Sequence, residues 1–183
     1  MIGSAARSGG WRRTSGALAL ALGAVALAAA PSTALDQGGC LEEATTVRVS
    51  EKLVHQADAL AEEESSWETA GELMLEAASL RLECSPERHE ALRTAARYFQ
   101  YAGAFGRASD ASFEAGQHCV WNGHVSAAAE AFIESATYAQ EAGDHARRIE
   151  AAGYAVRLAG SPHLTYMQRL AIRGRADRLL GDG

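Results

Sequence analysis

Residues 90–115 of this chain recur, with partial identity, as residues 130–155, after a shift of forty positions. The identical pairs include Tyr98 with Tyr138, Gly103 with Gly143, and Arg107 with Arg147. A fixed period of roughly 20–50 residues is typical of supersecondary units that stack side by side. The recurrence therefore predicts an all-α chain in which antiparallel helical hairpins form a short solenoid.

Apolar residues at spacings of three and four predict about seven helices and no strand. Short breaks separate them, at Ser85-Pro86, Gly103, residues 121–123, Gly143-Asp144 and Ser161-Pro162. Ser65 and Glu68 have the spacing of a capping box, and both Ser-Pro pairs suit helix starts. The inward faces are expected to include Val49, Leu53 and Ala57 in the first helix, His145 and Ile149 in the sixth, and Met167, Leu170, Ala171 and Gly174 in the last. Since every junction is short, sequential helices should be antiparallel neighbours.

The third and fourth predicted helices carry a pattern of large, small, aromatic and turn residues, in the order Leu92, Ala96, Phe99, Gly103, Phe105, Ala108 and Ala115. This pattern resembles the tetratricopeptide-type repeats and, in its longer period, the hairpins of soluble NSF attachment proteins. Phe132, Ala136 and Gly143 continue it in the second copy, whereas Ala139 and Arg148 depart from it. The resemblance implies that the first helix of each hairpin lines a concave groove that binds peptides or partner proteins.

The first 34 residues have the features of a cleaved leader. They contain three arginines and no acidic residue, then an apolar run at residues 17–30 and small residues at Ser32 and Ala34. The run is shorter than the roughly 20 residues that span a bilayer, so we expect no membrane anchor after cleavage. Export to the periplasm or the medium is predicted, with residues 35–183 as the helical-repeat domain. A twin-arginine route through Arg12-Arg13 and lipid attachment at Cys40 remain alternatives.

Residues 35–183 carry 14 basic and 23 acidic side chains, a formal charge of −9. This balance makes nucleic acid an improbable partner. The acidic residues concentrate near the beginning and the basic ones near the end, where Arg169, Arg173, Arg175 and Arg178 follow one another. Solvated helix faces and a polar cap on the last helix account for this distribution, and head-to-tail self-association is the alternative.

If the groove exists, its lining comes from the sides of the third and fifth helices that turn away from their packing faces. These residues are Glu90, Arg93, Arg97, Gln100, Glu130, Ile133, Thr137 and Gln140. Arg93 and Arg97 lie one turn apart and can present two guanidinium groups to a carboxylate, such as a peptide end. The alternative is an ordinary solvated face on which Glu90 supports both arginines.

Three cysteines leave at least one thiol unpaired. Cys40 precedes the first helix and Cys84 ends the second, so a Cys40–Cys84 disulfide would staple the first hairpin. A Cys84–Cys119 pair is the alternative. Among possible metal ligands, His118, Cys119 and His124 form the densest group in the sequence.

No catalytic or cofactor motif is evident in the sequence. We therefore expect a non-catalytic module in the cell envelope that binds a protein or peptide. A helical protein that binds a metal or small molecule is the alternative, and an envelope hydrolase is a more distant one.

Overall fold

The computed structural model describes residues 43–181. Seven α-helices and one short 3₁₀ turn, η1 (Glu64–Ser66), make up this part of the chain, and it contains no strand. The helices are α1 (Ala44–Leu60), α2 (Trp67–Ser79), α3 (Pro86–Tyr101), α4 (Phe105–Trp121), α5 (Val125–Ala142), α6 (His145–Ala159) and α7 (Tyr166–Gly181). The proposed leader and Cys40 lie outside the described residues.

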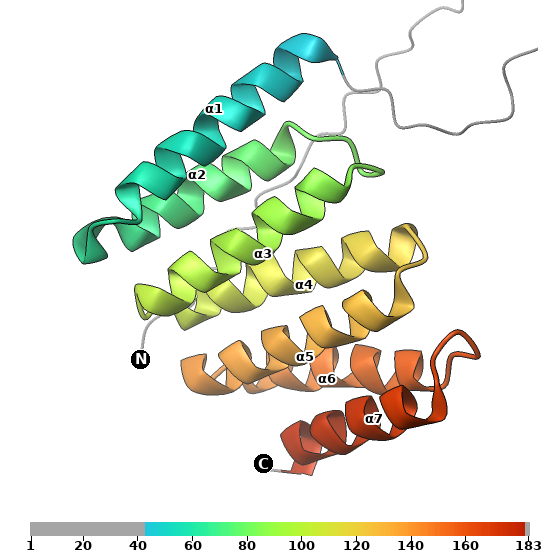
Figure 1. Ribbon diagram of the computed structural model, residues 1–183. Coiled ribbons are helices and arrows are strands. Elements are labelled where there is room, and N and C mark those ends of the chain that lie inside the picture. Colours follow the sequence, from blue (N-terminus) through green and yellow to red (C-terminus); the bar gives the residue numbers. More distant parts are fainter. Residues whose placement is uncertain (1–42, 182–183) are drawn as a thin grey trace, which may run out of the picture. The chain divides into compact units, whose positions relative to one another are not determined.

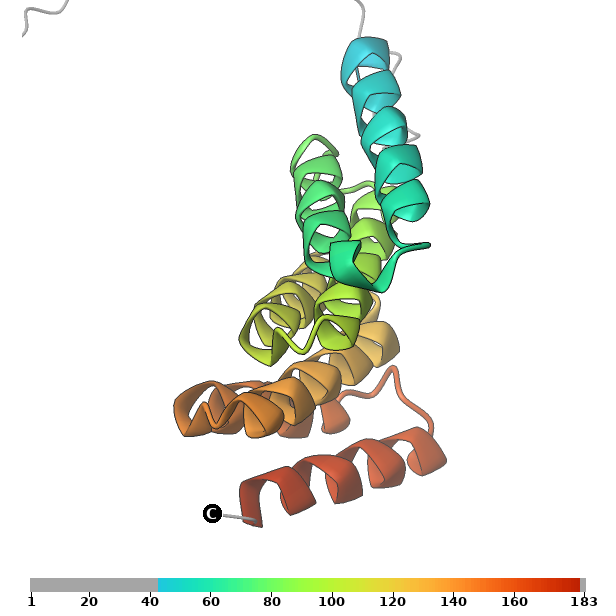
Figure 2. The same ribbon diagram turned by 90° about the vertical axis from the view of Figure 1, so that its left-hand side faces the viewer.

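Each helix packs against the next one in the sequence, and α5 also touches α7. The odd-numbered helices lie in one layer and the even-numbered helices in a second layer behind it (Figures 1 and 2). The prediction of an all-α, solenoid-like stack in sequence order is thereby confirmed. None of these helices has the length and apolar character that crossing a bilayer requires.

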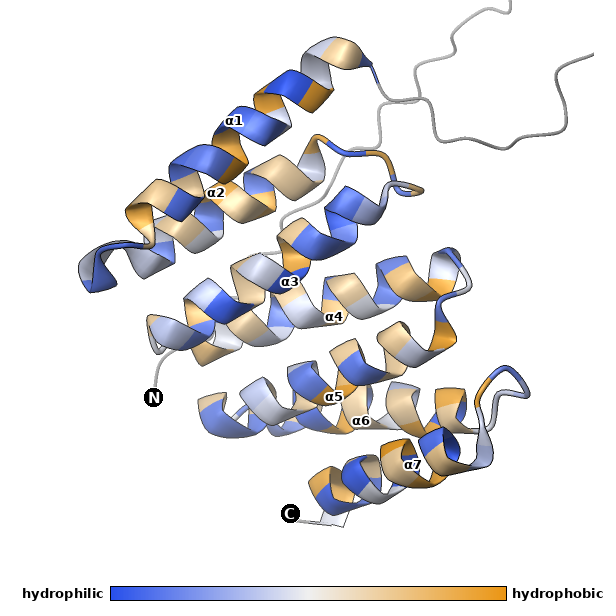
Figure 3. Cartoon of the chain, in the orientation of Figure 1, coloured by the Kyte–Doolittle hydropathy of each residue, from blue (hydrophilic) through white to orange (hydrophobic). Residues whose placement is uncertain are grey.

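Small side chains fill most of the interior between the two layers. Alanine dominates the buried apolar residues, and Figure 3 shows polar and apolar residues sharing every helix. Short side chains let helices approach closely, because nothing holds their backbones apart. The packing is especially close at Gly71 and Gly116. A Cβ at Gly71 would lie 2.7 Å from the Phe99 ring, and one at Gly116 would lie 2.9 Å from the Phe132 ring.

The helix boundaries follow local sequence signals. Gly103 and Gly143 end α3 and α5 with φ values of 72° and 74°, a left-handed conformation that side chains with a Cβ rarely adopt. Asp144 then caps α6, since its carboxylate accepts the backbone N–H of Arg147 at 2.9 Å. α3 begins at Pro86, as predicted.

Two predictions about the first hairpin are wrong. Val49 is exposed, and Ser50 takes the inward position, where its hydroxyl donates to the Ala77 carbonyl of α2 at 3.0 Å. The capping box does not form, because α2 begins at Trp67 with no side-chain cap, and Glu68 pairs with Arg107 of α4 instead.

The inward faces of α6 and α7 also differ from the prediction. His145 and Ile149 are exposed, while Arg148 is buried beside the alanines of α6. The predicted start of the last helix at Ser161-Pro162 is wrong. α7 begins at Tyr166, because Thr165 and Gln168 exchange capping hydrogen bonds that sequence reasoning missed. Its buried residues are consequently Ile172, Ala176 and Leu179, and Met167 and Leu170 are exposed.

Candidate functional site

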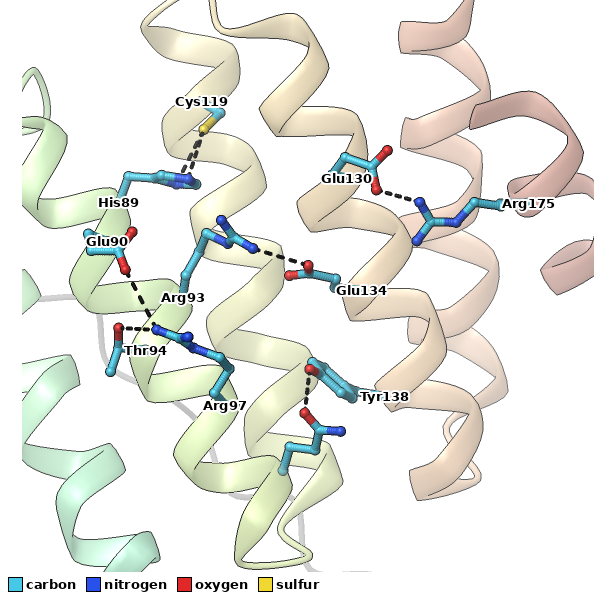
Figure 4. A network of polar contacts seen from close by, with 11 residues as sticks. His89, Glu90, Arg93, Thr94, Arg97, Cys119, Glu130, Glu134, Tyr138 and Arg175 are labelled. Atoms are coloured by element: carbon cyan, nitrogen blue, oxygen red, sulfur yellow. Dashed lines mark hydrogen bonds and ion pairs between the residues drawn. The ribbon is translucent and has the colours of Figure 1, made fainter. Parts of the chain in front are cut away.

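The predicted arginine pair lies on the outer side of α3. The side chains of Arg93 and Arg97 are 45% and 54% exposed. Arg97 lies 3.6 Å from the carboxylate of Glu90 and donates to the Thr94 hydroxyl at 3.0 Å, while Arg93 reaches Glu134 on α5 at 3.4 Å (Figure 4). Both guanidinium groups are thus accessible, and their long ion pairs at the surface hold them weakly.

Two tyrosines link the odd-numbered helices. The Tyr98 hydroxyl of α3 donates to the Asp58 carboxylate of α1 at 2.9 Å. The Tyr138 hydroxyl of α5 donates to the side-chain oxygen of Gln100 on α3, also at 2.9 Å. Gln100, predicted to line the groove, therefore has a hydrogen-bond partner within the fold.

Of the four α5 residues predicted to line the groove, one is buried and the other three lie at the surface. Ile133 is only 1% exposed and belongs to the core, so its assignment to the groove is wrong. Its helix position faces inward because α5 is covered by both α4 and α6. Glu130 pairs with Arg175 of α7, and the Thr137 hydroxyl donates to its own helix. Gln140 is exposed near the end of α5.

A cavity of about 570 Å³ opens between α1 and α3. Its apolar lining includes Val54 of α1, Met74 of α2 and Ala91 of α3, and its polar lining includes Glu90 and Arg97. Residues of α1 and α2 were absent from the predicted groove, because the forty-residue match covers only the later helices. The cavity that contains Arg97 is thus lined by the first three helices.

Two further cavities lie elsewhere on the stack. One of about 610 Å³ is bordered by α3, α4 and α6, and it is lined in part by Trp121, which is 80% exposed, and by His118. Another of about 400 Å³ lies between α6 and α7, where the exposed Tyr166 and Leu170 meet Arg169 and Arg173. Neither lies beside the predicted arginine pair.

A compact group of metal-ligand residues forms where the beginning of α3 meets the end of α4. The sulfur of Cys119 lies 3.3 Å from Nδ1 of His89 (Figure 4). One ligand atom each from His89, His118 and Cys119 lies within 4.8 Å of the others. His124, expected to belong to this group, does not, because it is exposed on the turn before α5. His89 takes its place.

The environment of this group favours uncharged side chains. Burial, followed by the nearby Arg93, lowers the pKa of His89, and burial, followed by Arg88, lowers the pKa of His118. Burial raises the pKa of the Cys119 thiol, with Arg93 opposing it. Cys119 is free, so the Cys84–Cys119 disulfide is wrong, while the Cys40–Cys84 pair falls partly outside the described residues.

Protein-family models, curated proteins and solved structures were compared with this chain, and none matched. The arrangement itself offers two kinds of chemistry. The cavity between α1 and α3 combines apolar walls with the accessible guanidinium of Arg97, and four carboxylates also line it. This lining suits a ligand with an apolar group and no more than one negative charge, placed at Arg97. The His89, His118 and Cys119 group combines two imidazoles with a thiol, which are ligands for thiophilic metals.

Proposed function

We propose that this chain is a non-catalytic, tetratricopeptide-like module of the cell envelope that binds a peptide segment of a partner protein. The supporting observation is the position of Arg97 at the cavity between α1 and α3. Its guanidinium makes one hydrogen bond to Thr94 and a 3.6 Å ion pair with Glu90, and more than half of its side chain is exposed.

The proposed ligand is a peptide with a carboxylate and a neighbouring apolar side chain. The carboxylate binds Arg97, since a charge-assisted, bidentate contact is stronger than the long pair with Glu90. The apolar side chain enters the space between Val54, Met74 and Ala91. A second guanidinium, from Arg93 one turn away, extends the positive surface toward α5. Four acidic residues around the cavity disfavour a second carboxylate there: Glu51, Asp58, Glu87 and Glu90.

Selection from a synthetic peptide library with free C-terminal carboxylates tests this proposal on the purified chain. Selected peptides should carry an apolar residue close to the carboxylate. Arg97→Ala should raise their Kd at least about tenfold, about 1.4 kcal/mol, and amidation of the carboxylate should have a similar effect. The double variant Arg93→Ala with Arg97→Ala should abolish binding while helicity and melting temperature stay unchanged.

Arg173→Ala is the matched control, because Arg173 is an exposed arginine on α7, away from this cavity. It should bind the selected peptides as the unmodified chain does. Unchanged affinity of the peptides for the double variant would contradict the assignment of Arg93 and Arg97 to the groove. Peptides that lose affinity only in Arg173→Ala would instead favour the cavity beside α7.

Export is the second part of the proposal and rests on the sequence of the first 34 residues. Mass spectrometry of the protein isolated from its own cell envelope tests it, because cleavage after Ala34 leaves Leu35 as the first residue. An intact amino terminus would contradict export through a cleaved leader. A lipid mass on Cys40 would establish the anchored alternative.

A further inference from the structure

We propose that His89, His118 and Cys119 bind one thiophilic metal ion, Cu(I) or Zn(II). Their ligand atoms lie within 4.8 Å of one another, although His89 is distant in the sequence from the other two. Two helices place them: His89 is in the first turn of α3, and His118 and Cys119 are in the last turn of α4. This site is separate from the proposed peptide groove.

The spacing fits a metal centre with a small adjustment. Donor atoms on one zinc ion lie about 2.0–2.3 Å from it, so they are about 3.3–3.8 Å from each other. The sulfur of Cys119 and Nδ1 of His89 already lie 3.3 Å apart. A ring nitrogen of His118, within 4.8 Å of both, needs to approach by about 1 Å, which a small rotation of an imidazole supplies.

His118 provides the second and independent observation. Its side chain is buried, with 8% exposure, yet Nδ1 has no hydrogen-bond partner among the residues the structure describes. A buried polar atom without a partner is costly, and such atoms in native proteins often mark a missing ion or water. Nε2 of His118 lies 3.4 Å from the Asn122 side-chain nitrogen, so a metal ion held with His89 and Cys119 would give Nδ1 the partner it lacks.

The surrounding charges permit a cation despite two nearby arginines. Arg88 pairs with Glu114 at 3.0 Å, and Arg93 pairs with Glu134 at 3.4 Å, so each guanidinium is balanced by a carboxylate. The thiolate formed on binding supplies a further negative charge. Thiolate and imidazole together select Cu(I) and Zn(II) over hard cations such as Mg²⁺ or Ca²⁺.

The three ligands distinguish the two candidate metals by coordination number. Zn(II) prefers four ligands, so three side chains leave one position for water, as in open zinc sites. Cu(I) accepts a lower coordination number, so the thiolate and the imidazoles can complete its coordination without water. The cavity of about 610 Å³ that borders His118 provides room for a water molecule at an open position.

Metal titration of the full chain, stripped with a chelator and kept under anaerobic conditions, tests the site. Co(II) serves as the spectroscopic substitute for Zn(II), and a coloured Cu(I) chelator serves as the donor for Cu(I). We expect one equivalent of at least one of these metals to bind. Co(II) should produce a thiolate charge-transfer absorption that Zn(II) abolishes, whereas Cu(I) should decolourise its chelator.

Three variants decide whether the metal occupies this site. Cys119→Ala should abolish the charge-transfer absorption, and His89→Gln should weaken binding at least about tenfold, as even indirect disturbance of metal sites does. His124→Gln is the matched control and should bind normally, since His124 is exposed on a nearby turn. Because His89 is only half-buried, His89→Gln stays informative if the core change Cys119→Ala prevents folding; circular dichroism establishes which variants fold.

Failure to bind either metal would overturn the proposal. Equal uptake by His89→Gln and the unmodified chain would overturn it as well, since other cysteines or histidines would then hold the ion. Neither result bears on the peptide groove, because the titration contains no peptide.

Discussion

The Tyr98 hydroxyl on α3 donates a hydrogen bond to the Asp58 carboxylate on α1, over a distance of 2.9 Å. Tyr138, forty positions later, makes the corresponding contact from α5 back to Gln100 on α3. These tyrosines therefore tie α3 to α1 and α5 to α3. The recurrence that is visible in the sequence thus includes residues that join successive hairpins.

Replacement of Tyr98 by phenylalanine should change how stability depends on pH. Burial, and then the hydrogen bond to Asp58, raises the pKa of Tyr98 to about 12. In the unfolded chain the Tyr98 hydroxyl ionises at about pH 10. The stability that Tyr98 contributes to the fold is therefore complete below about pH 10 and is lost as the pH rises to about 12. In a pH titration followed by tyrosinate absorbance, Tyr98→Phe should lack the tyrosine that ionises at the highest pH. Tyr166 is exposed, so Tyr166→Phe should retain that tyrosine. A tyrosine that still ionises at this high pH in Tyr98→Phe would contradict the assignment.

Gly71→Ala should destabilise the fold, because the new methyl group would lie 2.7 Å from the ring of Phe99. Overpacking of this kind costs about 1–3 kcal/mol. Gly116→Ala should behave similarly against Phe132. Gly174→Ala on α7 is the control: no atom lies within 4 Å of its added Cβ, so helix propensity should raise stability by up to about 1 kcal/mol. Urea unfolding measures all three, and equal effects at Gly71 and Gly174 would refute the close packing.

Arg107→Gln should weaken the contact between α4 and the first hairpin. The guanidinium lies 2.8 Å from Glu72 and 3.2 Å from Glu68, and 4.2 Å from the centre of the Phe99 ring. Exposed ion pairs and cation–π contacts together contribute about 1 kcal/mol. We expect the melting temperature to fall by a few degrees, with a smaller loss at high salt.

Arg173→Gln is the matched control for Arg107→Gln. Its ion pair with Asp177 spans 3.7 Å within α7 and joins no other helix. Its melting temperature should stay within error of the unmodified chain. A larger loss in Arg173→Gln than in Arg107→Gln would contradict the importance of the contact between hairpins.

Cys119 should resist alkylation in the folded protein and react once the chain unfolds. The residue is buried, and burial raises the pKa of its thiol, so little thiolate is available to an alkylating reagent. Under denaturing conditions without reductant, mass mapping should find Cys119 alkylated. If Cys40 and Cys84 form the proposed disulfide, neither should be labelled, whereas labelling of Cys84 would rule that pairing out.

The order of the helices was predictable from the sequence, because several of their boundaries depend on local chemistry. Gly103, Gly143 and Pro86 act within a few residues of their own position, and each does what its residue type predicts. The inward faces of α1, α6 and α7 were not predictable in the same way. Alanine-rich helices have only a weak difference between their faces, so the apolar pattern favoured Ile149 over Arg148 as the buried residue. The forty-residue shift carried the better signal, because it pairs Arg148 with the buried Ala108.

The candidate sites show the same limit. Arg93 and Arg97 were found because both lie on one helix, one turn apart. His89 was missed because its neighbour Cys119 is on another helix, and spacing along the chain says nothing about that contact. The antiparallel packing of α3 and α4 supplies the missing signal, since it brings the first turn of one helix against the last turn of the other.

Packing between neighbours in the sequence also has a consequence for how the chain acquires its structure. Helices touch mainly those that immediately precede or follow them, which gives a low contact order and favours rapid folding. A hairpin needs only the segment made just before it, so folding can advance along the chain in the order of synthesis. If a chain with this packing passed through a pore with its amino terminus first, its first helices would fold before its last helices had emerged.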